Sequence, residues 1–180
     1  MATTPIYHWP SPELTDKPDG PAQIKALALA IEGTVSGLIV KPPFVQVEQS
    51  IAQSIATSTI TPLNFDIENY DSSNMHSAAN PSRLTATKTG YYRLTGLVSF
   101  TGNTAGIRGI SWGIDGAFFG NGTAYPPNAN TLGVPAPDLI VFMNAGQYAE
   151  LRAYHTVGSA LLTVALANSR SYASAQFLTD

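Results

Sequence analysis

The chain has 180 residues, no cysteine, a net charge of −3, and only 12% charged residues beside 44% hydrophobic ones. The lack of cysteine excludes disulfides and thiolate metal sites, and the lack of a basic stripe argues against nucleic-acid binding. No apolar run reaches the roughly 20 residues of a membrane span, and the N-terminus has no secretory-signal pattern, so we expect a protein made in a cytoplasm. So few charges over a packed core favour a surface partly covered by other chains.

Residues 1–20 contain four of the 13 prolines. Proline fixes φ and removes a backbone donor, so this stretch is predicted to be an extended arm without a core of its own. It nevertheless carries four large apolar side chains, Ile6, Tyr7, Trp9 and Leu14. The composition favours an arm that anchors the chain to a larger assembly. The alternative is a floppy terminus with incidental aromatic residues.

Residues 21–38 are predicted to form a short helix, with Asp19 as a candidate N-cap. One apolar stripe runs along it at spacings of three and four residues: Ile24, Leu27, Ile31, Val35 and Leu38. About two heptads cannot hold a bundle together alone. The helix is therefore either a small multi-chain stalk below a stronger oligomer or a lid on the following domain. Residues 39–43 are a proline-containing linker.

From Phe44 to residue 180 the apolar residues recur at every second position rather than at helical spacing. This pattern predicts an all-β head domain. "GYYRLTGLVSFT" and "GIRGISWGIDG" alternate clearly, and "LIVFM" at 139–143 is predicted to be a buried strand. Asp115 and Gly116 predict a two-residue hairpin turn. Many short strands with Gly, Pro and Asn turns favour a sandwich or jelly roll.

Three motifs of the head occur in an order that resembles a known family. They are Asn80-Pro81-Ser82-Arg83, Gly90-Tyr91-Tyr92 and Asp115-Gly116. The segment 44–180 resembles the jelly-roll head shared by the first complement component and the tumour necrosis factor ligands, and more narrowly its versions in structural proteins of tailed phages. The Trp-Pro arm and helix resemble the start of some phage tail-fibre proteins. The resemblance implies a TNF-like jelly roll and a homotrimer.

Tyr91 and Tyr92 are neighbours on a predicted strand, so they point to opposite faces. We expect one of them to fill the core and the other to contact a sister subunit. Arg83 and Arg93 are expected to be surface or inter-subunit partners rather than catalytic residues.

The sequence offers few reactive combinations. His76 lies near Ser72, Ser73 and Ser77, but no Gly-x-Ser-x-Gly elbow occurs. His8, His76 and His155 have no zinc-ligand spacing. Asp66, Glu68 and Asp71 lie in a predicted loop that is either a calcium site or simply acidic and solvated. No catalytic, metal or cofactor site is therefore assigned. A glycan hydrolase would need two carboxylates at a suitable distance in a cleft.

Residues 117–137 are predicted to be an irregular loop at the rim of the head. It combines aromatic and amide side chains suited to carbohydrate or protein contact: Phe118, Phe119, Asn121, Tyr125 and Asn128. The alternative is that the aromatic rings pack beneath the loop as a satellite cluster.

The function that these features and the resemblance together imply is that of a non-enzymatic phage virion protein, assembled in the host cytoplasm. Its partners would be two further copies of itself, other virion proteins through the arm, and a host-surface glycan or protein. A tail fibre or tail-tip protein for host adsorption is favoured. The alternative is a decoration protein on the capsid.

Overall fold

The computed structural model describes residues 2–4, 6–11, 13, 19–38 and 41–180, and the chain divides into two compact units. The first is Met1–Lys41 and the second, the head, is Pro42–Asp180. Each unit is described by itself below.

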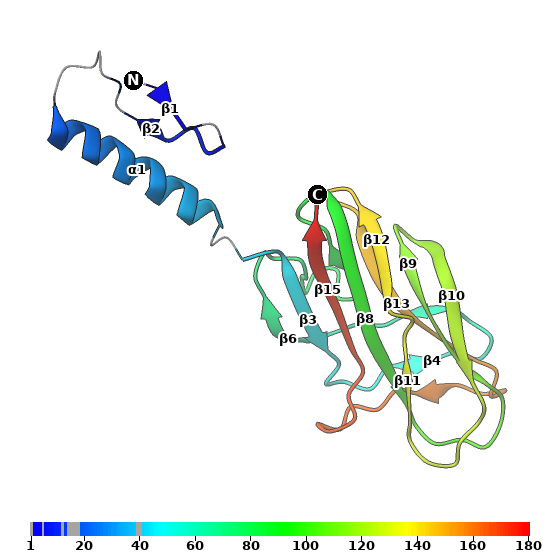
Figure 1. Ribbon diagram of the computed structural model, residues 1–180. Helices are drawn as coiled ribbons and strands as arrows, with labels where there is room; N and C mark the ends of the chain where they lie inside the picture. Colours follow the sequence, from blue (N-terminus) through cyan, green and yellow to red (C-terminus); the bar gives the residue numbers. More distant parts are fainter. Residues whose placement is uncertain (1, 5, 12, 14–18, 39–40) are drawn as a thin grey trace. The chain divides into compact units, whose positions relative to one another are not determined.

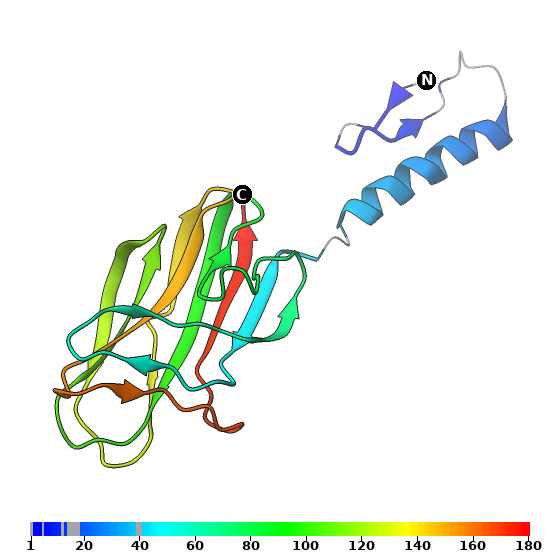
Figure 2. The same cartoon turned by 180° about the vertical axis from the view of Figure 1, so that it is seen from behind.

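The head is built from two antiparallel sheets that lie face to face (Figures 1 and 2). The six-stranded sheet has the order β11 (Leu132–Pro135), β8 (Gly90–Phe100), β15 (Tyr172–Thr179), β3 (Phe44–Glu48) and β6 (Ile67–Asp71), with β12 (Leu139–Met143) also paired to β8. The five-stranded sheet has the order β10 (Ala117–Tyr125), β9 (Arg108–Ile114), β13 (Tyr148–His155) and β5 (Thr61–Pro62), with β7 (Leu84–Thr85) paired to β13. A separate two-stranded sheet is formed by β4 (Ser54–Ile55) and β14 (Leu161–Leu162). The predicted all-β sandwich is confirmed.

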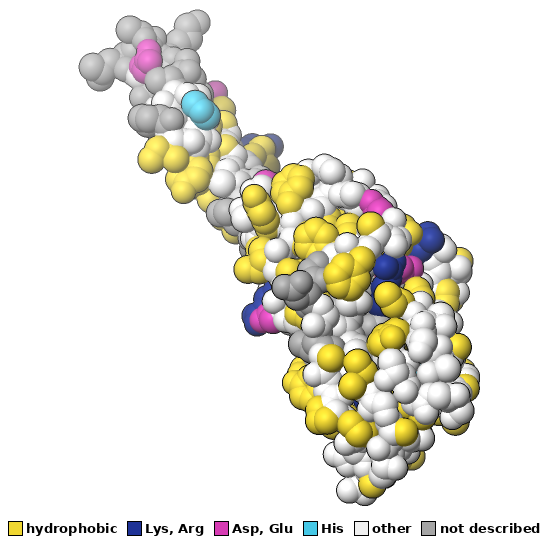
Figure 3. Space-filling view, turned by 90° about the vertical axis from the view of Figure 1, so that its right-hand side faces the viewer, with side chains coloured by type: hydrophobic (Ala, Val, Ile, Leu, Met, Phe, Trp, Pro, Cys, Tyr) yellow, Lys and Arg dark blue, Asp and Glu magenta, His cyan; other side chains and the backbone are white. Residues whose placement is uncertain are grey.

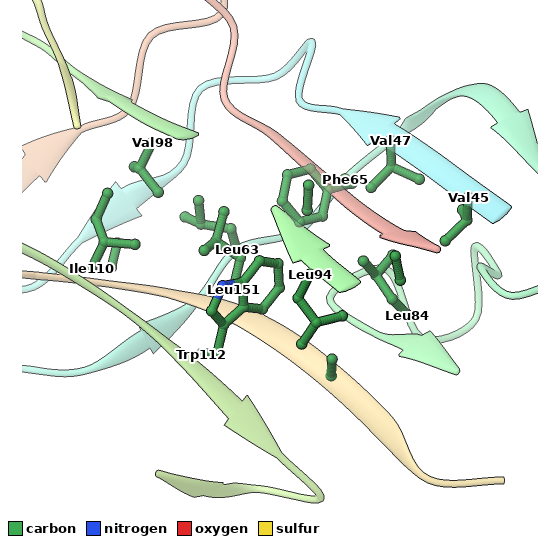
Figure 4. Packing of buried hydrophobic residues seen from close by; sticks show 14 of the residues in the cluster. Val45, Val47, Leu63, Phe65, Leu84, Leu94, Val98, Ile110, Trp112 and Leu151 are labelled. Carbon is green, nitrogen blue, oxygen red and sulfur yellow. The ribbon is translucent and has the colours of Figure 1, made fainter. Parts of the chain in front are cut away.

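The core lies between the two sheets and follows from the two-residue period of the strands. Along β8, Tyr92, Leu94 and Val98 are fully buried. Trp112 of β9 and Leu151 of β13 meet them from the other sheet (Figure 4). The indole Nε1 of Trp112 donates to the carbonyl of Pro137 at 2.9 Å, so even the polar atom of this ring is paired.

The turn between β9 and β10 has the predicted chemistry. Asp115 has φ 47° and Gly116 has φ 80°, so both central residues have the positive φ of a type I′ turn. The carboxylate of Asp115 also accepts from the backbone N–H of Tyr148 and from Gln147. This confirms the predicted hairpin.

Several local predictions for the head are wrong. The segment predicted as an irregular loop contains β10, which pairs along β9 with a register shift between Phe119 and Thr123. Gly122 lies in that shift, and a Cβ there would be 2.6 Å from the carbonyl oxygen of Ile110. Glycines at a bulge hide a strand from a pattern search because they have no side chain to alternate. The acidic segment predicted as a loop is largely β6, which is paired to β3.

Gly90 begins β8 in a conformation that side chains rarely adopt. Its φ is +150°, and a Cβ would lie 2.3 Å from the backbone carbonyl of Thr179. We expect Gly90→Ala to lower the free energy of unfolding by about 1–3 kcal/mol, measured by urea denaturation. Gly146→Ala is the matched control, because φ is +92° there but nothing lies within 4 Å of the added carbon. Equal losses in the two variants would refute the role of the close approach.

The first unit contains one helix, α1 (Gly20–Leu38). Asp19 caps it, since its Oδ1 accepts from the backbone N–H of Ala22 at 3.2 Å, as expected of an N-cap side chain. No helix among the described residues is long and apolar enough to cross a membrane.

The N-terminal segment, predicted to be an extended arm, contains strand pairing that the sequence analysis did not predict. β1 (Ala2–Thr3) pairs antiparallel with β2 (Pro10–Ser11) to make a small hairpin. The rings of Tyr7 and Trp9 stack with centroids 5.2 Å apart, and the indole Nε1 of Trp9 donates to the hydroxyl of Thr34 on α1 at 2.9 Å. Proline is compatible with this because a two-stranded hairpin consists only of edge strands. Leu14 lies outside the described residues.

Candidate subunit interface

An exposed apolar patch lies on the outer face of the six-stranded sheet. Its members are Tyr91 of β8, Ile140 and Phe142 of β12, and Leu178 of β15, hereafter the sheet patch. Ile140 is 62% exposed and Phe142 48% exposed. Pairing places these residues together, because Phe142 is opposite Tyr91 and Ile140 is opposite Arg93. Four large apolar side chains on one strand cluster are more than the single exposed hydrophobics of an ordinary surface.

Tyr91 and Tyr92 point to opposite faces of β8. Tyr92 is fully buried, and its hydroxyl donates to the carbonyl of Lys88 at 2.9 Å. Tyr91 is 45% exposed and packs edge-on against Phe142, with ring centroids 5.3 Å apart. Tyr92 is thus part of the core, and Tyr91 belongs to the sheet patch.

A hollow of about 470 Å³ adjoins the sheet patch between Arg93, Asp138, Ile140 and Leu178. Arg93 donates to both carboxylate oxygens of Asp138, with Nε to Oδ1 at 3.0 Å. This hydrogen bonding holds the pKa of Asp138 below its usual value. Arg93 is therefore already paired within its own chain, and the ion pair forms a polar border to the patch.

The prediction that "LIVFM" is a buried strand is half wrong. Val141 and Met143 of β12 point into the core, whereas Ile140 and Phe142 point outward. A continuous apolar run cannot reveal this from sequence alone, because it fits a strand buried on both faces.

A second exposed apolar surface lies at the opposite sheet, along the edge strand β10. Phe118 is 58% exposed and Phe119 39% exposed. Phe118 also borders an apolar groove of about 260 Å³ whose other walls include Ile60 and Tyr154. Figure 3 views the head from the side on which β10 lies. Hydrophobic side chains gather over the upper part of the head in this view. Phe118 is opposite Gly113 and Phe119 is opposite Trp112, so the two rings point to opposite sides of the strand. We call these two residues the β10 edge.

The remaining residues of the predicted contact loop are divided by the structure. Tyr125 ends β10 and packs against the core. Asn128 lies in the loop after β10, where its backbone carbonyl accepts from Asn103 and its side chain accepts from Asn130. The side chain of Asn121 lies outside the described part of the structure. The five residues therefore do not form one surface.

The apolar stripe of α1 remains uncovered within its own unit. Ile24 is 70% exposed and Val35 43% exposed, Leu27 is also exposed, and Ile31 is half-buried. The hairpin packs at Thr34 and does not cover the stripe. The side chain of Leu38 is not described. An amphipathic helix gains most of its stability by burying its apolar face, and this face has no cover among the described residues of its own unit.

Arg83 contacts its own chain. Its guanidinium lies 4.0 Å from the centre of the Tyr148 ring, and its Nε lies 3.9 Å from Glu150 Oε1. Glu150 is buried on the outer side of the five-stranded sheet, where it also accepts from Ser82 and from Arg152 at 2.9 Å. The Ser82-Arg83 motif thus holds the segment before β7 onto the sheet.

His76 is held by two acceptors and does not activate a serine. Its Nδ1 lies 2.8 Å from Glu68 Oε1 and its Nε2 lies 3.2 Å from the carbonyl of Pro81. Asp71 accepts from the backbone N–H groups of Ser73, Met75 and His76 at 2.9–3.0 Å. These contacts organise the turn after β6.

No metal-ligand cluster occurs among the described residues. His155 is fully buried and its Nε2 lies 2.8 Å from the carbonyl of Ile55. Asp66 accepts from the backbone and hydroxyl of Ser50, while Glu68 and Asp71 are engaged as described above. The three acidic side chains that suggested calcium are therefore not brought together.

We expect millimolar calcium to leave the melting temperature unchanged, because the carboxylates of the β6 segment already accept backbone and side-chain donors. Differential scanning fluorimetry with calcium and with EDTA checks this. A ligand that binds only the native state raises the melting temperature. A calcium-dependent rise that Asp71→Asn abolishes would establish the site after all.

The head is similar to several solved structures. The globular domain of zebrafish complement 1qA protein superposes with a TM-score of 0.58 at 10% identity, over 77% of this chain and 98% of that chain. Murine APRIL superposes at 0.56 and 11%, over 77% and 100%. Eiger TNF from S. frugiperda superposes at 0.53 and 10%, over 78% and 95%. The head has the C1q/TNF-type jelly-roll fold. No family model and no curated protein sequence matches the chain.

The C1q/TNF-type fold confirms the jelly-roll prediction for the head. At about a tenth sequence identity the likeness concerns the fold alone. The resemblance of the N-terminal segment to phage tail-fibre proteins stays a prediction.

Proposed function

We propose that this protein is a non-enzymatic structural protein of a tailed-phage virion, in which three copies of the head form a homotrimer. The observation that carries the proposal is the sheet patch, a cluster of Tyr91, Ile140, Phe142 and Leu178 left exposed in a single chain. Full burial of such side chains contributes about 1.5–3 kcal/mol each. The C1q/TNF-type fold supports three copies, because members of that group commonly assemble as trimers.

Two different apolar surfaces suit a cyclic trimer. A ring with more than two members needs a heterologous interface, in which one surface of a subunit contacts a different surface of the next. The sheet patch of one subunit would receive the β10 edge, Phe118 and Phe119, of its neighbour. Aromatic residues at such a contact supply most of the binding energy.

The helix would form a short stalk in the same trimer. The uncovered stripe on α1, which contains Ile24, Leu27 and Val35, is the seam that three parallel helices would share. A stalk this short depends on the head to bring the helices together, since isolated helices of such length are marginal in water.

The N-terminal hairpin would attach the trimer to the particle. Ile6 is 79% exposed and Tyr7 57% exposed at its tip, whereas Trp9 is tied to α1. The apolar tip supports a contact with another virion protein. We favour a tail fibre or tail-tip protein in host adsorption, because the arm resembles the start of such proteins.

Labelling of intact virions tests the proposed location. An antibody against the head, imaged by electron microscopy on purified particles, should mark the tail tip or fibres. Labels distributed over the shell would replace the tail assignment with capsid decoration. Absence of the protein from purified particles would contradict the virion role altogether.

A further inference from the structure

A polar groove of about 470 Å³ lies on the outer face of the six-stranded sheet, away from the sheet patch. Its lining includes Glu48, Ser99, Thr131, Asn168, Arg170 and Tyr172. Tyr172 is opposite Leu97 in β8, whereas the sheet patch lies around Tyr91 at the start of the same strand. The groove is therefore at the other end of the sheet from the apolar surface.

The groove offers a hydrogen-bond donor that has no partner among the described residues, the Nε–H of Arg170. Ser99 is 2% exposed, and its backbone N–H donates to the hydroxyl of Ser171 at 3.0 Å. Arg170 donates through Nη1 to Glu48 Oε2 at 3.3 Å, while its Nε–H has no partner in the described part of the chain. Buried polar groups are usually paired, so the unpaired Nε–H of Arg170 beside this hollow calls for an explanation.

The charges of the groove compensate each other. Glu48 and Arg170 form an ion pair, and the other polar lining groups are hydroxyls and an amide. A charged ligand would have to compete with one member of that pair, whereas a neutral ligand with many hydroxyls could use both. The ring of Tyr172 and the side chain of Leu97 add an apolar surface beside the polar groups.

The floor of the groove is open because Gly133 of β11 has no side chain. It is opposite Ser99, and a Cβ there would meet only the side chain of Leu97, at 3.4 Å. A larger residue at this position would project into the hollow without breaking the strand pairing.

From these contacts we infer that the polar groove binds a neutral saccharide. Its apolar face lies against Tyr172 and Leu97, and its hydroxyls bond to Ser99, Asn168 and the Glu48–Arg170 pair. The volume accommodates one or two sugar rings. Binding here needs only the head fold, so the groove would take a sugar whether or not the protein is part of a virion.

Saturation-transfer NMR on the purified full chain tests the groove. The probes are the methyl glycosides of glucose, galactose, mannose and N-acetylglucosamine, with glucuronate and glucose 6-phosphate as charged comparators. We expect saturation of at least one neutral glycoside. Gly133→Val, which fills the groove, should abolish it, and Asn168→Ala should weaken binding by about tenfold. Asn80→Ala, an exposed asparagine in a turn elsewhere, is the matched control and should bind normally.

Three results would overturn the inference. They are no saturation of any neutral glycoside, saturation of the charged probes alone, and unchanged binding by a folded Gly133→Val variant. The location of the protein on a virion has no bearing on these measurements. The saccharide inference can therefore be refuted without affecting the proposed virion role, and the reverse also holds.

Discussion

Replacing Trp112 by alanine is expected to lower the free energy of unfolding of the head by about 3–5 kcal/mol. Trp112 is 1% exposed and lies beside Leu151, its cross-strand neighbour, on the core side of its sheet (Figure 4). Its removal leaves a cavity that strands of two sheets cannot close without moving. The measurement is urea denaturation followed by circular dichroism, at one protein concentration for all variants, because self-association shifts apparent stability.

Trp112→Phe distinguishes the contribution of the aromatic ring to stability from that of its hydrogen bond. It keeps most of the aromatic volume but leaves the carbonyl of Pro137 without the donor that lies 2.9 Å away. The expected loss is about 1 kcal/mol, the net contribution of one hydrogen bond, because the carbonyl is only partly buried. A loss below 1 kcal/mol for the alanine variant would show that Trp112 is not a central core residue.

Ile140→Asp is expected to convert the proposed trimer into monomers at micromolar protein concentration. The substitution places a carboxylate in the middle of the sheet patch, where burial without a partner is strongly unfavourable. Because Ile140 is 62% exposed in a single chain, the variant should fold normally as a monomer. Sedimentation velocity reports the mass, and circular dichroism reports the fold.

Ile51→Asp is the control for that experiment. Ile51 is the same residue type, is 70% exposed, and lies beyond the end of β3, outside the sheet patch. It should leave the oligomer intact. Equal dissociation of both variants, or of neither, would remove the sheet patch as the subunit interface.

The fold of the head could be predicted because its strands alternate cleanly. In β8 the buried Tyr92, Leu94 and Val98 recur at even positions, and the Asp115-Gly116 turn specifies its own geometry. The strand β10 was hidden by its glycines and by the bulge that they permit. The N-terminal hairpin was hidden by its prolines, which usually indicate an unpaired segment.

The candidate interface was predictable only in part. Tyr91 was identified because neighbouring residues of a strand point to opposite faces. The sequence analysis missed Ile140, Phe142 and Leu178 as exposed residues. Their exposure depends on which strand lies beside β12 and on what covers the sheet, and the linear sequence contains neither kind of information. The polar groove was missed for a related reason. Its residues come from β3, β8, β11, β15 and the loops beside them, and only the fold brings them together.

The central claim is that the jelly-roll head is completed by two further copies of itself. The most direct test is the mass of the purified full-length chain, measured by sedimentation equilibrium over a range of micromolar concentrations. We predict three times the mass of one chain throughout. A single species with the mass of one chain would contradict the claim.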